Sequence, residues 1–390
     1  HESGIAITGL KSHLDSGNPG RNIAVIGELD SVKVLGHPFG DKETTAAHAC
    51  GHHCQIAMML GVAVGLKASG VLESLSGKVT FMAVPAEEYI EIEYRDNLRR
   101  NGEIEFLGGK PEFVRLGQFD DIDMAMMTHT SVPTNDSKIT IGGTNVGMVG
   151  KSIQFSGVAS HAGGSPHLGV NALNAAMVAM SAIHAQRETY RDKDSIRIHP
   201  IITKGGVAVS SVPADVRMET YVRGGSIEAF LSASEKVDRA LRAGAMTVGG
   251  SVTIQTLPGY LPIQNNETFL DLYQNNAAEL VGQEKISRLP PHVMHGTGST
   301  DMGDISQLMP VIHPYVEAAS GNGHGIDYVI NDYELAVVTC AKAMAMTVID
   351  LLADGASNAS QIISENDSPL TIPSYLSLLR SMTKEETFKE

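Results

Sequence analysis

Three histidines, two cysteines and a glutamine lie within eight residues of this chain, at His48-Ala49-Cys50-Gly51-His52-His53-Cys54-Gln55. Histidine and cysteine bind zinc and similar divalent ions, and the Cys50-Gly51-His52 spacing lets a thiolate and an imidazole converge from one tight turn. The chain has only three cysteines, so two of them in this segment indicate metal binding. A polar turn with a chance run of histidines is the alternative interpretation.

Two adjacent carboxylates, Glu87 and Glu88, follow a predicted buried strand at 78–84. Adjacent residues at a strand end point in different directions, so one carboxylate can bind a metal while its neighbour acts as a general base on water. Metal-assisted hydrolysis requires this division of roles. A solvated acidic turn would give the same sequence pattern.

Two further histidines add to this set. His129 ends the apolar run 123–128, and His324 lies in a glycine-rich loop at 321–325. Taken separately, the first is typical of a strand edge and the second of a flexible turn. Together with the earlier segments they give five donors of the kinds that suit zinc or manganese: Cys50, His52, Glu88, His129 and His324.

His161 is a candidate catalytic residue of another kind, in the segment 160–166 between a predicted strand and a predicted helix. An imidazole N–H is a competent donor to an oxyanion that develops on a substrate. A capped entry to the helix explains the segment equally well.

Apolar strands separated by helical stretches predict a doubly wound α/β sheet, with its site at the carboxyl ends of the strands. The strands are expected at 22–29, 78–84 and 123–128, and 55–66 has the continuous apolarity of a core helix. The candidate ligands follow these strands or open this helix.

The pattern changes near Val149 to a β-α-β-β-α-β order, the ferredoxin-like arrangement. Its elements are expected at 152–155, 170–187, 196–204, 216–222, 227–241 and 251–257. The apolar α/β pattern then resumes at 269–280, 311–316 and 335–352.

We therefore expect a mixed-sheet catalytic domain formed by 1–147 and 263–390, with an inserted ferredoxin-like α+β domain at 148–262. The polar tail from Ser357 onward is expected to be a surface appendage.

Composition limits the class of protein. The chain has 390 residues, 42% hydrophobic and 19% charged, as a globular protein of one large or two moderate domains does. A formal net charge of −15 argues against a nucleic-acid or anionic-membrane partner, since either requires a basic face. With few cysteines, no signal-peptide pattern and no apolar run long enough to span a bilayer, we expect a reduced, cytoplasmic protein.

The order of the motifs resembles the dinuclear metallopeptidases that include aminoacylase and carboxypeptidase G. It is most similar to their amidohydrolase subgroup, which contains hippurate, indoleacetyl-amino-acid and aminobenzoyl-glutamate hydrolases. The likeness covers nearly the whole chain in order. It rests on His48 to His52, Pro85 to Glu88, His129, Ser160 to Ala172, Gly298 to Asp301 and His324.

The resemblance implies one or two divalent ions, Mn or Zn in the first place with Co or Ni also suitable, held by the five donors named above. It implies that Glu87 is the general base and that His161 helps to stabilise the tetrahedral oxyanion. In the family the inserted domain mediates dimerisation and its histidine can act across the dimer, so we expect a homodimer. Contacts to a small-molecule substrate are expected from His53, Asn171, Ser210 and Arg223.

Three features depart from the family pattern. His53 stands where Asp or Asn is common, and it is open to roles as a further ligand, an orienting group or a substrate contact. Ser210 stands where Asn is usual, which changes how a substrate carboxylate or carbonyl is held. The chain also opens at His1 close before its first predicted strand, where relatives usually have a longer helical segment; truncation and processing are both open.

The leading hypothesis is a metal-dependent hydrolase of C–N bonds that cleaves the amide between an acyl or aryl-acyl group and an amine or amino acid. The alternative is hydrolytic deamination of an amino-aromatic acid, such as a nitroanthranilate-type substrate. A third hypothesis, a binding or scaffold protein on a decayed hydrolase fold, would need a lost ligand or a lost base, and the sequence shows neither.

Overall fold

The computed structural model describes residues 1–389, and its largest domain is built on a six-stranded mixed sheet in the order β1-β2-β6-β3-β7-β16. The strands are β1 (Glu2–Ile5), β2 (Gly9–Asp15), β6 (Gly77–Val84), β3 (Arg21–Glu28), β7 (Met124–Met126) and β16 (Val311–Ile312). The last four run parallel, while β1 and β2 are antiparallel additions at one edge that the sequence did not predict. The predicted α/β class is confirmed.

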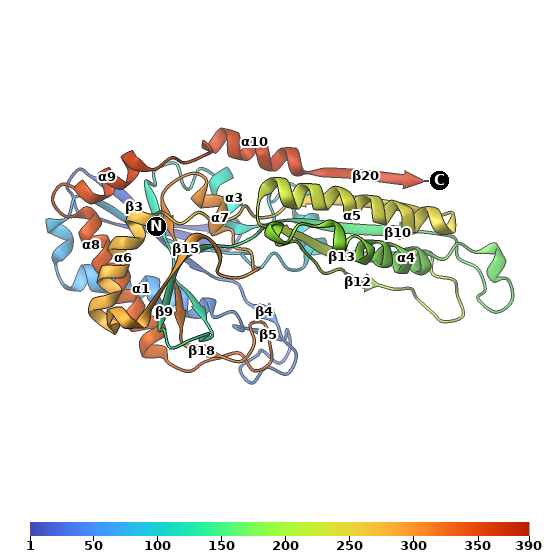
Figure 1. Ribbon diagram of the computed structural model, residues 1–390, viewed down its shortest axis with the longest axis horizontal. Coiled ribbons are helices and arrows are strands. Elements are labelled where there is room, and N and C mark those ends of the chain that lie inside the picture. The colour runs from blue at the N-terminus through green and yellow to red at the C-terminus, as the bar shows by residue number, and fades with distance from the viewer. Residues whose placement is uncertain (390) are drawn as a thin grey trace.

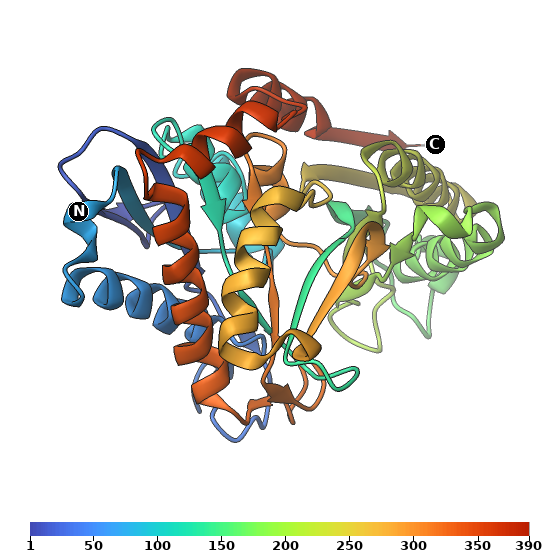
Figure 2. The same ribbon diagram turned by 60° about the vertical axis from the view of Figure 1, so that its left-hand side comes forward.

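Helices cover both faces of this sheet. Along β3, Ile23 and Val25 join one apolar cluster and Ala24 and Ile26 join another, because successive side chains of a strand point to opposite faces. The first cluster is closed by α1 (His52–Ala68), α6 (Glu267–Val281) and α8 (Cys340–Leu352), and Figure 2 shows α6 and α8 side by side. The second is closed by α3 (Gly109–Arg115), α7 (Met302–Ser306) and α10 (Ile372–Met382).

A second sheet lies beside this domain, in the order β11-β13-β10-β14-β20, with β12 also paired to β13. Its strands are β10 (Gly147–Ser156), β11 (Arg197–Ile198), β12 (Ile201–Lys204), β13 (Asp215–Gly224), β14 (Ser251–Pro258) and β20 (Lys384–Lys389). Helices α4 (Ala172–Ala185) and α5 (Ile227–Val248) pack against each other over one face (Figure 1). The chain therefore has the β-α-β-β-α-β order expected between 148 and 262, and the exact domain boundaries stay a prediction.

The tail from Ser357 is not the surface appendage that its polarity suggested. It forms α9 (Ser357–Glu365), α10 and β20, and Figure 1 shows it running from the large domain to the edge of the second sheet. Tyr375 and Leu379 of α10 are fully buried, and β20 pairs antiparallel with β14. Apolar residues at helical spacing give α10 one buried face although the segment as a whole is polar.

The predicted apolar segment 311–316 is broken in two. After β16, His313 and Pro314 leave the main sheet, and the chain continues as β17 (Tyr315–Glu317) in a small sheet of the order β15-β9-β17-β8. The other strands there are β8 (His129–Ser131), β9 (Ile139–Thr144) and β15 (Ile286–Met294). Because Pro314 has no N–H to donate to a ladder, a strand is readily interrupted there.

The segment Glu334–Leu352 is long and apolar enough to cross a membrane, with a mean hydropathy of 1.8. It is a π-helical turn (Glu334–Thr339) followed by α8, and 56% of it is buried inside the protein. Its neighbours are α1 and α6, so it packs as a core helix does.

Candidate active site

The His48 to Gln55 segment forms a tight turn that opens α1. Gly51 has φ of 84°, and a Cβ at this position would collide with the hydroxyl of Thr130, so only glycine fits. His52 is the first residue of α1 and is fully buried, while Cys50 precedes the turn. The turn thus brings a thiol and an imidazole to the carboxyl edge of the sheet.

Three neighbouring parallel strands deliver the other side chains. Glu28 ends β3 and Asp30 follows it, Glu87 and Glu88 follow β6, and His129 follows β7. The carboxyl ends of parallel strands meet at one edge of a sheet, so these groups lie together. His324 comes from a separate loop, where its backbone N–H donates to the carbonyl of Ala49 at 2.9 Å.

The five predicted metal donors form two overlapping groups. Cys50, His52 and His129 form one group, and Cys50, Glu88 and His324 form the other; within each, the donor atoms lie within 4.8 Å of one another. The Cys50 Sγ lies 3.5 Å from His129 Nε2, and Glu88 Oε1 lies 3.2 Å from His324 Nε2. Cys50 belongs to both groups, so the two groups overlap at this thiol.

His52 has the surroundings of an oriented metal ligand. Its Nδ1 lies 3.0 Å from the carbonyl oxygen of Asp30 and 3.3 Å from that residue's Oδ1. Its Nε2 is buried and makes no hydrogen bond within residues 1–389, and it faces the carboxylates of Glu28, Glu87 and Glu88. A histidine ligand commonly donates its second nitrogen to a carboxylate or carbonyl in this way, so the residues fit a cation.

The two adjacent carboxylates, Glu87 and Glu88, have pKa values shifted in opposite directions. Burial, together with Glu28 and Glu88, raises the pKa of Glu87 well above its usual range. Burial acts on Glu88 in the same direction, but the neighbouring His324 outweighs it and lowers the pKa of Glu88. Glu87 is thus suited to exchange a proton and Glu88 to stay ionised.

A buried charge network beneath the site was missed from the sequence. Lys110 of α3 donates to Glu28 Oε1 at 2.5 Å and also to Asp301, and all three side chains are fully buried. Glu28 ends a buried strand and Asp30 lies two residues beyond it, a pattern similar to the one that drew attention to Glu87 and Glu88, so they could have been found. Lys110 carries no such signal.

Four of the five proposed metal donors and the candidate base Glu87 line a cavity of about 240 Å³. The predicted residues that line it are Cys50, Glu87, Glu88, His129, Arg223 and His324. Other polar residues in its wall were not predicted as site residues: Asn145, Tyr260, His295, Ser299, Thr300, His313 and Tyr315. Within the described chain, this cavity is where the candidate base and donors meet.

Three predicted residues of the inserted domain lie outside this cavity. His161 Nδ1 accepts hydrogen bonds from the backbone of Gly163 and Gly164, and the side chain is not part of the cavity wall. Asn171 caps α4 by accepting from the backbone N–H groups of its first turn, and Ser210 lies beside the 160–166 segment. A single chain does not bring these residues to the metal donors.

His53 is also turned away from the cavity. Its ring centroid lies 4.9 Å from that of His48, and its Nε2 lies 3.3 Å from the hydroxyl of Tyr333. Burial and the neighbouring His48 lower the pKa of His53 to about 4, so its imidazole is neutral near pH 7. This position does not reach a substrate in the metal cavity within the one chain.

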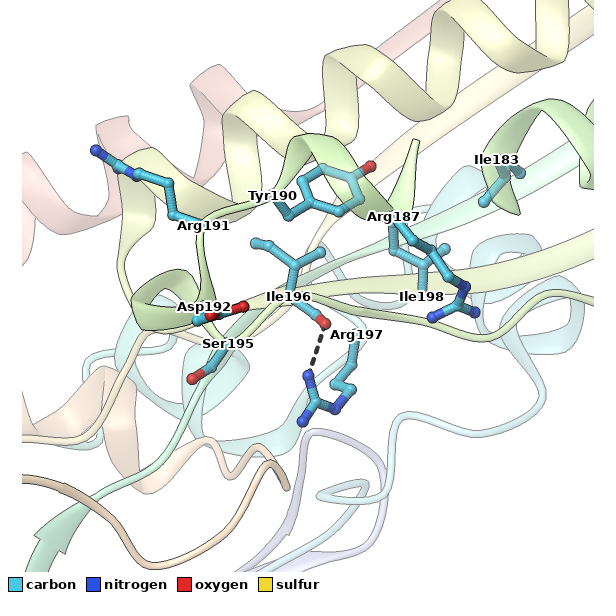
Figure 3. A pocket seen from close by; sticks show the side chains of 9 residues that line it. All are labelled: Ile183, Arg187, Tyr190, Arg191, Asp192, Ser195, Ile196, Arg197 and Ile198. Carbon is cyan, nitrogen blue, oxygen red and sulfur yellow. Dashed lines mark hydrogen bonds between the residues drawn. The ribbon is translucent and has the colours of Figure 1, made fainter. Parts of the chain in front are cut away.

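Two further cavities have arginines in their walls. One, about 360 Å³, is lined by Arg187, Arg191 and Arg197 (Figure 3). Arg197 also lines a cavity of about 310 Å³ together with Arg223, which in turn lines the metal cavity. Basic side chains thus approach the candidate site in a protein whose net charge is −15.

Known proteins match this chain over most of its length. A mouse Xaa-Arg dipeptidase is 30% identical over 341 residues, which are 85% of this chain and 70% of the relative. The human Xaa-Arg dipeptidase is 29% identical over 78% of this chain and 66% of the relative. The indole-3-acetyl-aspartic acid hydrolase of Enterobacter agglomerans is 26% identical over 71% of this chain and 62% of the relative.

The fold is shared with solved structures. Bacillus subtilis YXEP, a dinuclear metal binding peptidase of the M20 family, superposes with a TM-score of 0.61 at 19% identity, covering 90% of this chain and 87% of that one. The family model described as peptidase family M20/M25/M40 matches residues 24–350. The predicted resemblance is thereby confirmed: the chain belongs to peptidase family M20/M25/M40 and is a hydrolase of that family.

Proposed function

We propose that this protein hydrolyses the amide bond between an acyl group and an amino acid, with two divalent ions bound by Cys50, His52, Glu88, His129 and His324. The observation that carries the proposal is the pair of donor groups that share Cys50 beside the buried carboxyl of Glu87. The mixed N, O and S donors suit zinc or manganese, with cobalt or nickel also suitable. When bound, such ions supply Lewis acidity to the scissile carbonyl.

The protein's own residues then move the proton. Glu87 takes a proton from the attacking water and delivers it to the leaving nitrogen, so the amide is replaced by an acid and an amine. Burial, and then Glu28 and Glu88, raise the pKa of Glu87, so its ionised carboxylate is a stronger base than a free one. We propose that His161 of one subunit stabilises the oxyanion in the site of the other subunit of a homodimer. Within one chain, His161 lies outside the metal cavity.

Arg223 is proposed to bind the carboxylate of the leaving amino acid. It lies directly opposite Arg197 in the antiparallel pair of β13 and β11, and like charges in such a pair repel each other. Their guanidinium groups donate to the carbonyls of Thr297 at 3.2 Å and Ile196 at 2.9 Å, and neither forms an ion pair within residues 1–389. A substrate carboxylate would relieve this repulsion.

Two further proposals concern the oligomeric state and the cellular compartment. We propose the homodimer on the basis of His161, Asn171 and Ser210, which need a second chain to reach a metal cavity. The three cysteines are free thiols, which supports a reducing compartment such as the cytoplasm.

A hydrolysis screen tests the function. The protein, loaded with Mn²⁺ or Zn²⁺, is given hippurate, p-aminobenzoyl-glutamate, indoleacetyl-aspartate and dipeptides that end in arginine, and the released amine and ammonia are measured separately. We expect amino acid without ammonia. Ammonia from aminobenzoates with all acyl-amino acids intact would favour the deaminase instead, and absence of both bound metal and turnover would favour a scaffold protein.

A further inference from the structure

His313 is the most unusual polar side chain in the wall of the metal cavity. It is 1% exposed, and neither Nδ1 nor Nε2 has a hydrogen-bond partner within the described residues. The buried His37 shows the ordinary case, since its Nε2 bonds to the carbonyl of Tyr328 at 2.8 Å and its Nδ1 accepts from the N–H of Phe39 at 3.2 Å. Burying unpaired polar atoms is costly, so His313 requires a partner that is not part of the protein.

The fold holds the ring of His313 at the cavity and keeps it from a protein partner. The residue lies in the break between β16 and β17, and its backbone N–H donates to Asn265 Oδ1 at 2.8 Å. Its ring contacts Tyr315 edge to face, with centroids 4.8 Å apart, and lies 6.0 Å from the ring of His129. It is therefore next to the metal donors without belonging to either donor group.

Several other polar side chains in this wall already have partners within the protein. The face of Tyr315 is covered by His295, stacked at 3.7 Å, and the Tyr315 hydroxyl accepts from Asn145 at 2.8 Å. The Oγ of Ser299 is buried and, like His313, has no partner within residues 1–389. Apolar surface in the wall comes from Met148 and from the rings of Tyr260 and Tyr315, so the unpartnered polar atoms of His313 and Ser299 stand out in it.

We propose that His313 is a substrate-binding residue that hydrogen-bonds a polar group on the acyl side of the substrate, and that the preferred acyl group is small and polar. Hydroxyacyl and aminoacyl groups belong to this class, whereas benzoyl and indoleacetyl groups do not. The orientation of the substrate in the cavity rests on the proposed function. There Arg223 binds the carboxylate of the leaving amino acid, so the acyl group lies against the part of the wall that contains His313. A cavity of about 240 Å³ also suits a small acyl group.

A matched pair of substrates tests the proposal. Glycolyl-arginine and propionyl-arginine have acyl groups of the same size that differ by a hydroxyl in place of a methyl, and the same pair on glutamate gives a second series. A neutral imidazole can both donate to and accept from a hydroxyl, whereas a methyl leaves both ring nitrogens unpaired. We expect kcat/KM of the wild type to favour the glycolyl compounds by about tenfold or more.

Substitutions assign this preference to His313. In His313→Phe, which keeps a ring and removes both nitrogens, the ratio should fall to within about twofold of unity. His313→Gln can still donate and accept a hydrogen bond, so it should keep part of the preference for glycolyl compounds. It also tests the proposal if His313→Phe folds poorly. His37→Phe is the matched control at a buried, fully bonded histidine, and it should leave the ratio unchanged. Metal content is measured for each variant, because His313 lies near His129.

A binding measurement separates this inference from the proposed function. Without any turnover, glycolate should raise the melting temperature of the metal-loaded wild type more than propionate does, and the difference should vanish in His313→Phe. If that result is found but no acyl-amino acid is cleaved, the proposed function fails and the inference stands. An unchanged preference in a metal-loaded His313→Phe, or a wild type that favours propionyl compounds, overturns the inference.

Discussion

Asp30 contacts the ring of His52 at two points: its backbone carbonyl is hydrogen-bonded to Nδ1 at 3.0 Å, and its carboxylate Oδ1 lies 3.3 Å from the same nitrogen. The other oxygen of that carboxylate accepts from the backbone N–H of Glu88 at 2.8 Å. Asp30 thus contacts a proposed ligand of each donor group. The geometry makes Asp30 a positioning residue for both ions, and removing it should weaken metal binding more than folding.

Asp30→Ala is expected to lower metal affinity by about 10- to 100-fold, the usual cost of losing a carboxylate that orients a histidine ligand. Competition with a chelator of known affinity measures the change. Asp41→Ala is the control, since Asp41 is exposed and caps a local turn away from the site. Equal affinity in Asp30→Ala and wild type would refute the positioning role.

Chelation should destabilise the protein, because metal binds the folded chain and not the unfolded one. At a free metal concentration 100 times Kd the stabilisation is about 2.7 kcal/mol, so the melting temperature should rise with added Zn²⁺ or Mn²⁺. Cys50→Ala should abolish this rise, since Cys50 belongs to both donor groups, and His324→Ala should reduce it. A larger effect of His324→Ala than of Cys50→Ala would argue against Cys50 as a donor in both groups.

Lys110→Met should cost about 3–5 kcal/mol of unfolding free energy, because it leaves the carboxylates of Glu28 and Asp301 buried without their cation. Lys33→Met is the matched control: Lys33 pairs with Glu91 at 2.6 Å on the surface, where such a pair contributes less than about 1 kcal/mol. Denaturant unfolding of the two variants measures the difference. Similar losses in both would show that the buried network is not a structural support.

Asp96 should contribute to the acid sensitivity of the fold. Burial opposes ionisation, but hydrogen bonds from Arg100 at 2.6 Å and Arg99 at 2.7 Å outweigh it and hold the pKa of Asp96 below its usual value. The folded state therefore binds the proton more weakly than the unfolded state. The stabilisation of the folded state by ionised Asp96 is fully present above the pKa of an aspartate in the unfolded chain, about 3.9. It is lost as the pH falls through the pKa of Asp96 in the folded state.

Asp96→Asn should therefore be less stable than wild type at pH 7, and the gap should close as the pH falls below about 4. Unfolding free energies measured between pH 7 and the acid limit of folding test this. The exposed Asp367→Asn serves as control and should follow the wild-type curve. A stability gap for Asp96→Asn that is independent of pH would contradict a lowered pKa of Asp96 in the folded state.

The metal donors could be predicted because residue type, position after strands and order along the chain act together. Cys50-Gly51-His52, Glu87-Glu88, His129 and His324 each allow another interpretation alone, but their order along the chain resembles a known family, and the structure brings all five predicted donors together. Likewise, the apolar strands and the β-α-β-β-α-β order follow from periodicity. The antiparallel edge strands β1 and β2 were missed because their sequences lack a continuous apolar run.

The remaining features depend on tertiary contacts. Lys110 is buried in a short helix only because Glu28 and Asp301 meet it there, and these residues are far apart in sequence. His313 sits inside an apolar run, and the break between β16 and β17 that turns its ring to the cavity arises from pairing with two different sheets. Whether His53, Asn171 and Ser210 contact a substrate depends on a second chain, which one sequence does not place.

The sharpest test of the proposed chemistry is the turnover of Glu87→Gln with its metal content measured in the same preparation. Glutamine keeps the size and the hydrogen-bonding of the side chain but cannot take the proton from water. We predict that kcat for an acyl-amino acid falls by about 10²- to 10⁴-fold while the bound metal per chain stays at the wild-type value. Turnover near the wild-type rate with full metal occupancy would contradict the assignment of Glu87 as the general base.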